Sequence, residues 1–107
     1  MRIVFAEEDT MFRLMEVGVQ RRLTPAGEKV LTYFCGRDFS AQLEILTGMA
    51  DRLGLPSALD AVVCTDAGAL ADAVASADVL VAEAAPITRA HLERAHRLRL
   101  VQKFGRD

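Results

Sequence analysis

The stretch Ala61 to Ala82, AVVCTDAGALADAVASADVLVA, contains the pattern that decides the fold. Its two ends, 61–65 and 79–82, are short apolar runs without polar alternation, which is typical of strands buried on both faces. Between them, Asp66 is a helix-capping residue that precedes an alanine-rich segment. The stretch therefore predicts a strand, a helix and a second strand, which is the repeating unit of a parallel sheet.

The same alternation continues in both directions along the chain. Three more runs predict strands, at 3–6, 30–34 and 98–104. Three further helices are predicted, capped by Asp9 or Thr10, by Ser40 and by Thr88. Five short strands in alternation with helices predict a doubly wound α/β fold, with about five parallel strands in three layers. The 107 residues, 51% of them hydrophobic, are expected to form one domain, 1–107.

Composition excludes several functional classes. Thirteen basic and fifteen acidic residues leave a net charge of -2, which gives no general attraction to nucleic acid or acidic lipid. Charges interrupt each apolar run, no secretory leader pattern is present, and Cys35 and Cys64 belong to no CxxC or Cys/His cluster. We therefore expect a cytoplasmic protein without nucleic-acid or membrane partners. The glycines are too widely spaced for a GxGxxG or P-loop phosphate-binding motif.

Two loops are candidate binding sites, because ligands of doubly wound sheets bind at the carboxyl ends of the strands. Glu7, Glu8 and Asp9 offer three carboxylates to a magnesium ion, or else they form a solvated loop that favours the next helix N-terminus. The loop 83–88 has small residues whose backbone amides can bind a carboxylate, or else it simply begins a helix. Both alternatives remain open at this point.

The carboxyl-terminal third contains few catalytic groups of its own. His91 and His96 stand five residues apart, which is the wrong spacing for a metal pair on one helix, so both are expected on the surface. No serine or cysteine has a visible His/Asp partner set, so nucleophilic catalysis has no support. The basic residues from Arg89 onward lack aromatic stacking partners other than Phe104 and are interpreted as a solvated face.

The same third of the chain resembles a known family. Three segments carry the resemblance: ADVLVAEAAPIT at 77–88, HLERA at 91–95 and RLRLVQKFG at 97–105. In composition and order they are similar to the NAD-dependent D-isomer-specific 2-hydroxyacid dehydrogenases, which include phosphoglycerate dehydrogenase and hydroxypyruvate or glyoxylate reductase. The remainder of the chain agrees with this family only in the order of its strands and helices.

The resemblance implies a flavodoxin-like substrate domain, with the NAD(P)-binding Rossmann domain absent from this chain. The family's GxGxxG motif, catalytic arginine, supporting acid and general-acid histidine lie in sequence that would follow Asp107. The parent enzyme is then expected to transfer a hydride between NAD or NADP and a small 2-hydroxy or 2-oxo acid, while these residues alone are inactive. The expected partners are that acid, the missing Rossmann domain and, as an open alternative, a second copy of the chain.

The resemblance also implies where the substrate binds. The expected substrate-binding residues lie at the carboxyl end of the last two predicted strands or directly after them: Ala84, Ala85, Lys103, Phe104, Gly105, Arg106 and Asp107. Lys103 matches a basic residue near the anionic groups of the substrate, and the residues after Phe104 match the start of a loop whose amides hold it. Arg106 and Asp107 replace the family's Val-Gly. Ala82 and Glu83 replace its Arg-Ser, which favours a small acid over a phosphorylated one.

A receiver-like phosphoacceptor signalling domain is the alternative class. The opening RIVFAEEDTMFR, at 2–13, resembles that of response-regulator receivers, which are doubly wound and near this length. Asp66 would then be the phosphoacceptor and Lys103 the lysine of the fifth strand. A free-standing binding domain is a third alternative.

Overall fold

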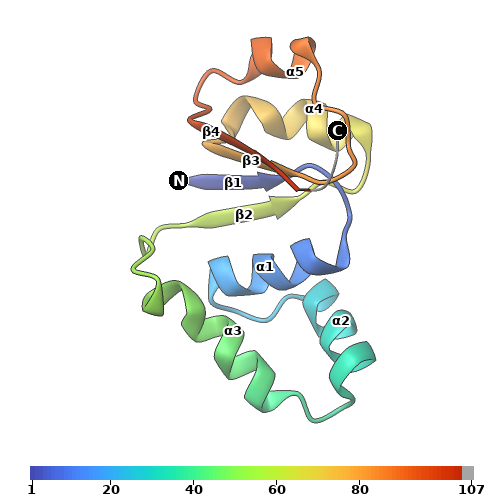
Figure 1. Ribbon diagram of the computed structural model, residues 1–107, viewed down its shortest axis with the longest axis vertical. Helices are drawn as coiled ribbons and strands as arrows, with labels where there is room; N and C mark the ends of the chain where they lie inside the picture. The colour runs from blue at the N-terminus through green and yellow to red at the C-terminus, as the bar shows by residue number, and fades with distance from the viewer. Residues whose placement is uncertain (105–107) are drawn as a thin grey trace. The chain divides into compact units, whose positions relative to one another are not determined.

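The computed structural model describes residues 1–104, which form two compact units. The sheet unit comprises residues 1–8 and the described chain from Asp60 onward, and the helical unit comprises residues 9–59 (Figure 1). The sheet unit contains β1 (Arg2–Phe5), β2 (Asp60–Val63), α4 (Ala67–Ala73), the 3-10 helix η1 (Val74–Ser76), β3 (Val79–Ala82), α5 (Arg89–Arg94) and β4 (Leu100–Lys103). The helical unit contains α1 (Thr10–Gln20), α2 (Pro25–Cys35) and α3 (Ser40–Arg52).

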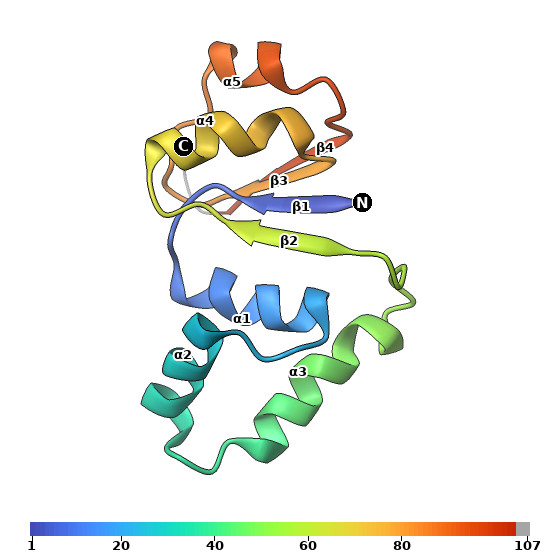
Figure 2. The same cartoon turned by 180° about the vertical axis from the view of Figure 1, so that it is seen from behind.

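The four strands of the described residues form one parallel sheet in the order β2-β1-β3-β4. This order is that of a flavodoxin-like doubly wound sheet with one strand fewer. Figures 1 and 2 show α4 and α5 on the same face of the sheet. The α/β class and the parallel sheet predicted from the sequence are confirmed, with four strands in the described residues instead of about five.

The strand predicted at 30–34 is wrong, because these residues lie inside α2. The side chain of Thr24 accepts a hydrogen bond from the N–H of Gly27 at 3.0 Å, and Pro25 occupies the first turn. Leu31 is the buried residue of the segment, whereas Tyr33 and Phe34 are exposed. A capped start and one buried face therefore outweigh the β propensity of valine, threonine and the two aromatic residues.

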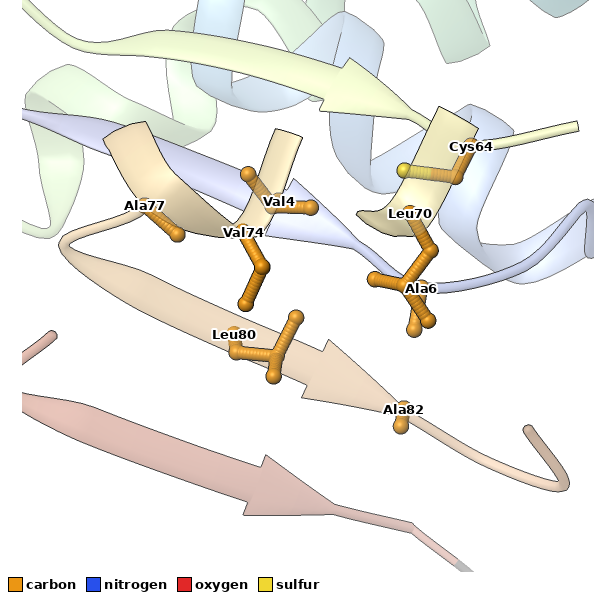
Figure 3. Packing of buried hydrophobic residues seen from close by; sticks show 8 residues of the cluster. All are labelled: Val4, Ala6, Cys64, Leu70, Val74, Ala77, Leu80 and Ala82. Atoms are coloured by element: carbon orange, nitrogen blue, oxygen red, sulfur yellow. The ribbon is translucent and has the colours of Figure 1, made fainter. Parts of the chain in front are cut away.

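The core of the sheet unit lies between one face of the sheet and the α4–η1 helical segment. Val4 and Leu80 are partners in the register of β1 and β3, so their side chains point to the same face. Ala82, two residues beyond Leu80, shares this face. Leu70 and Val74 pack against these residues from the helical side, and the whole cluster is buried (Figure 3).

Asp78 joins three strands at the amino edge of the sheet. Its carboxylate accepts the backbone N–H of Arg2 at 2.7 Å, its own N–H donates to the Arg2 carbonyl at 2.9 Å, and its carbonyl accepts the N–H of Arg99 at 2.8 Å. The hydrogen bond from the Arg2 amide holds the pKa of Asp78 below its ordinary value, against the opposing effect of burial. The positive charge of Arg97 acts in the same direction as the hydrogen bond.

We expect Asp78→Asn to destabilise the protein at about pH 7 and to lose this effect in acid. A carboxyl group whose pKa is lowered by folding stabilises fully above its ordinary value, 3.8, and this stabilisation disappears as the pH falls through the folded-state pKa. Urea-unfolding midpoints of the wild type and the variant should therefore converge between about pH 5 and pH 2. Asp72→Asn, at an exposed position of α4, is the matched control. A gap that stays constant over this range would contradict a role for the ionised carboxylate.

In the helical unit, α1 and α3 approach closely at Gly18. A Cβ atom at this position would lie 3.3 Å from the carbonyl oxygen of Leu46. Arg21 follows α1 in the left-handed region, with φ 57°, and its guanidinium binds the Asp51 carboxylate at 2.9 Å and the Leu55 carbonyl at 3.0 Å. These contacts hold the end of α1 against the last turn of α3 and the segment that follows it. Within residues 1–104, no helix has the length and apolar character needed to cross a membrane.

Candidate functional site

The candidate site lies at the carboxyl edge of the sheet, between the loops that follow β1 and β3. These strands are parallel neighbours, so the residues after each strand emerge side by side. The N–H of Ala6 donates to the Val81 carbonyl at 2.8 Å and continues the pairing up to the point where the loops begin. The position between β1 and β3 is where a flavodoxin-type sheet changes winding direction and where such folds bind ligands.

The carboxylate of Glu7 is bound by three consecutive backbone amides of the loop after β3. Oε2 accepts the N–H of Glu83 at 2.9 Å and that of Ala85 at 2.9 Å, and Oε1 accepts the N–H of Ala84 at 2.8 Å. We call these three N–H groups the amide nest, because successive amides that converge in this way form an anion-binding concavity. Hydrogen bonds to an ionised acceptor are stronger than neutral ones. Glu7 therefore fixes the loop after β3 to the loop after β1.

A cleft of about 250 Å³ adjoins the amide nest within the sheet unit. Its lining comes mainly from the residues that follow β1, β2 and β3. These lining residues are Ala6, Glu7, Glu8, Cys64, Thr65, Asp66, Ala67, Leu70, Ala85, Pro86, Thr88 and His91. The small side chains leave space for a ligand of a few heavy atoms, and two acids besides Glu7 give the cleft a negative character.

Two side chains that line the cleft, Cys64 and Asp66, have environments typical of structural residues. Burial, followed by the negative charge of Asp66, raises the pKa of the Cys64 thiol. A thiol held neutral in this way is a poor nucleophile. The carboxylate of Asp66 accepts the N–H of Ala69 at 2.7 Å and caps α4, as the sequence predicts. Neither group is arranged for covalent catalysis.

His91 is half-buried and lines the cleft, where the sequence predicted a surface residue. Its Nδ1 accepts the backbone N–H of Thr88 at 3.1 Å, and the Thr88 hydroxyl accepts the N–H of His91 at 3.3 Å. This reciprocal pair is a capping box that begins α5. Because Nδ1 is an acceptor, the neutral ring carries its proton on Nε2. The sequence predicted Thr88 as the cap, but the conventional Glu or Gln of a capping box is replaced by histidine.

Four of the substrate-binding residues expected from the sequence are described, and they lie at or just beyond the carboxyl ends of two neighbouring strands, β3 and β4. Ala84 and Ala85 follow β3, and their amides are engaged by Glu7. Lys103 ends β4 beside Ala82 of β3, and the N–H of Phe104 donates to the Ala82 carbonyl at 2.7 Å. Gly105, Arg106 and Asp107 lie outside the described residues, so their predicted contacts stay predictions.

Two of the three acids after β1, Glu7 and Asp9, have separate roles, which disfavours the magnesium site considered from the sequence. Glu7 binds the amide nest, whereas the Asp9 carboxylate accepts the N–H groups of Met11 at 2.8 Å and Phe12 at 3.2 Å and caps α1. Among the residues from 1 to 104, the structure contains no group of three histidine, cysteine or acidic side chains placed to hold a metal ion. Glu7 therefore supports the geometry of the loops, and Asp9 that of the helix α1.

The receiver alternative requires Asp66 and Lys103 to act on one phosphoryl group. Asp66 follows β2 and Lys103 ends β4, and these are the two edge strands of the described sheet. Two strands separate them, and adjacent strands are about 4.8 Å apart. The strand order therefore disfavours a joint phosphoacceptor site.

The contact between Glu7 and the amide nest is the feature that the sequence did not predict. The sequence indicated the two parts of this contact separately. Glu7 is one of the acids after a buried strand, and the loop 83–88 has small residues whose amides can bind a carboxylate. They lie 76 to 78 residues apart, and only the adjacency of β1 and β3 brings them together. The nature of the partner, a carboxylate, matches the chemistry expected for this loop.

Comparison with known proteins assigns no family. No protein-family model matches the chain, and searches of curated proteins and of solved structures found no match.

Proposed function

We propose that this chain is the substrate-binding domain of an NAD(P)-dependent D-2-hydroxyacid dehydrogenase. One observation carries the proposal: residues 77–104, which bear the resemblance, form β3, α5 and β4 in succession, with β3 and β4 as parallel neighbours. The loop after β3 and the end of β4 consequently lie at the same edge of the sheet. A small acid that contacts both would bind at the carboxyl edge, where such folds hold their ligands.

The proposed ligand is a small 2-hydroxy or 2-oxo acid. Lys103 ends β4 and provides a positive charge for the carboxylate of the acid. The N–H groups of Ala84 and Ala85 are hydrogen-bond donors at the neighbouring strand, although Glu7 occupies them in this structure. Binding therefore starts from the Lys103 ammonium group.

The described residues do not fit NAD or NADP. A dinucleotide pyrophosphate requires a glycine-rich turn between a strand and a helix. After β1 the chain has Glu7, Glu8 and Asp9 instead, and their negative charges repel phosphate. In this proposal the cofactor and the hydride transfer belong to the Rossmann domain, and this chain binds and orients the acid.

The test is a titration of the ¹⁵N-labelled chain with hydroxypyruvate, followed by amide chemical shifts. We expect saturable shifts at Lys103, Phe104 and the loop after β3. Dihydroxyacetone, which has nearly the same shape but no carboxylate, should cause no such shifts. Lys103→Gln should weaken hydroxypyruvate binding about fivefold or more, because a charged partner of the carboxylate is lost.

Lys29→Gln is the matched control, because Lys29 lies on α2 in the helical unit. It should leave hydroxypyruvate binding unchanged. Equal shifts with both ligands, or equal effects of the two lysine substitutions, would contradict the proposal. Oxidation of NADH by the isolated chain with hydroxypyruvate or glyoxylate would also contradict it, because the proposal places the redox site in the other domain.

A further inference from the structure

The amide nest, Glu83 to Ala85, is a complete carboxylate site whose occupant belongs to the protein. Three consecutive N–H groups meet both oxygens of the Glu7 carboxylate at 2.8 to 2.9 Å. This arrangement is the one by which backbone nests capture the free carboxylate of a ligand. The bound group comes from a distant part of the chain, so the nest and its occupant are separate pieces of structure.

The amide nest is accessible from solvent, so an external carboxylate can replace that of Glu7. Glu83 and Ala84 are exposed, and Ala85 and Glu7 are half-buried, so the hydrogen bonds lie at the surface of the sheet unit. The adjoining cleft of about 250 Å³ can hold the rest of a small molecule. An external carboxylate must compete with a tethered one, whose effective concentration is on the order of millimolar or higher.

We infer that Glu7 is a built-in competitor for the amide nest, and that a small monocarboxylate binds there when Glu7 leaves. Glu8 and Asp66 line the same cleft and repel a second negative charge, so dicarboxylates and phosphorylated acids are disfavoured. The inference deepens the proposed function and rests on it for the identity of the natural acid. Glu7 would then regulate access of that acid to the site.

The test uses Glu7→Ala and acetate, which reproduces the carboxylate that the substitution removes. Without acetate the variant should unfold at a lower temperature than the wild type, because three amides lose their acceptor. Acetate should raise its Tm by about 4–8 °C at ten times the dissociation constant, relative to sodium chloride at equal ionic strength. The amide resonances of Glu83, Ala84 and Ala85 should shift over the same concentration range.

Two controls make the result specific. Glu93→Ala removes an exposed glutamate from α5 and leaves Glu7 in the amide nest. Acetate and sodium chloride should therefore change the Tm of this variant equally, and the same holds for the wild type. If Glu7→Ala is unfolded without acetate, the inference requires acetate to restore its folded circular dichroism spectrum. A folded or unfolded Glu7→Ala variant that does not respond to acetate would overturn the inference and leave Glu7 as a fixed structural contact.

The outcome is separable from that of the proposed function. If hydroxypyruvate binds the wild type through Lys103 while Glu7→Ala ignores acetate, the inference fails and the proposed function stands. Acetate could instead raise the Tm of Glu7→Ala while hydroxypyruvate and dihydroxyacetone cause equal amide shifts in the wild type. The amide nest would then be a carboxylate site in a protein of another class.

Discussion

Leu80→Ala is expected to lower the free energy of unfolding by about 3 kcal/mol. Leu80 is 0% exposed and lies at the centre of β3, between the neighbouring strands β1 and β4. The shortened side chain would leave a cavity beside Val4 and Val74, which are also 0% exposed. Because strand pairing holds β3 on both sides, the backbone cannot move inward to fill that cavity. The loss is a large part of the roughly 5–15 kcal/mol that stabilises an ordinary domain.

Leu100→Ala is the matched control, since it removes the same atoms from an edge strand. Leu100 is 53% exposed on β4, so its truncation should cost less than about 1 kcal/mol. Urea denaturation followed by circular dichroism measures both values. Equal destabilisation by the two substitutions would contradict the placement of Leu80 in the core between the sheet and α4.

Local signals in the sequence were sufficient to predict those elements in which an apolar run and a capping residue lie close together. The strand predicted at 79–82 has those bounds in the structure, and Asp66 and Thr88 cap the helices they were predicted to cap. In each case a short stretch contains both the buried pattern and the polar group that satisfies the first free amides of the helix. These elements position the candidate site.

The same approach failed at 30–34, where composition and helix-start signals disagree. In the sequence, Thr24 stands before Pro25, and because the residue before a proline avoids the helical region, this pair favours the end of a helix. Proline is equally favourable in the first turn of a helix, and the Thr24 side chain makes the capping bond there. Once α2 begins, one buried face containing Leu31 suffices, and the aromatic residues remain exposed.

The candidate site was only half predictable for a different reason. The sequence indicated a carboxylate-binding loop and an acidic loop, but each had an equally good local explanation. Their contact depends on β1 and β3 being neighbours, and that order is a property of the assembled sheet. The small residues of the loop therefore indicated carboxylate binding only as one of two open alternatives, and the sequence could not identify Glu7 as the occupant of the amide nest.

Gly27→Ala is expected to destabilise the helical unit by about 2 kcal/mol, although alanine is normally the better helix former. A Cβ atom at Gly27 would overlap Cγ2 of Val17 on α1 and would lie 3.0 Å from the Thr24 hydroxyl. Val17 is 0% exposed, and a valine in a helix has one strongly preferred rotamer, so it cannot turn away. The Thr24 hydroxyl is equally fixed, because it caps α2.

Gly48→Ala in α3 is the control, because we expect it to change the stability of the protein in the opposite direction. A Cβ atom there meets only the end of the Arg52 side chain, at 3.0 Å, and that side chain can move. The substitution should stabilise the protein by about 0.5–1 kcal/mol, since glycine is the poorer residue in a helix interior. Thermal unfolding followed by circular dichroism should thus give a lower Tm for Gly27→Ala and a higher Tm for Gly48→Ala. If both variants gained stability, α2 could not pack on α1 through Gly27 and Val17, because helix propensity alone would then account for both changes.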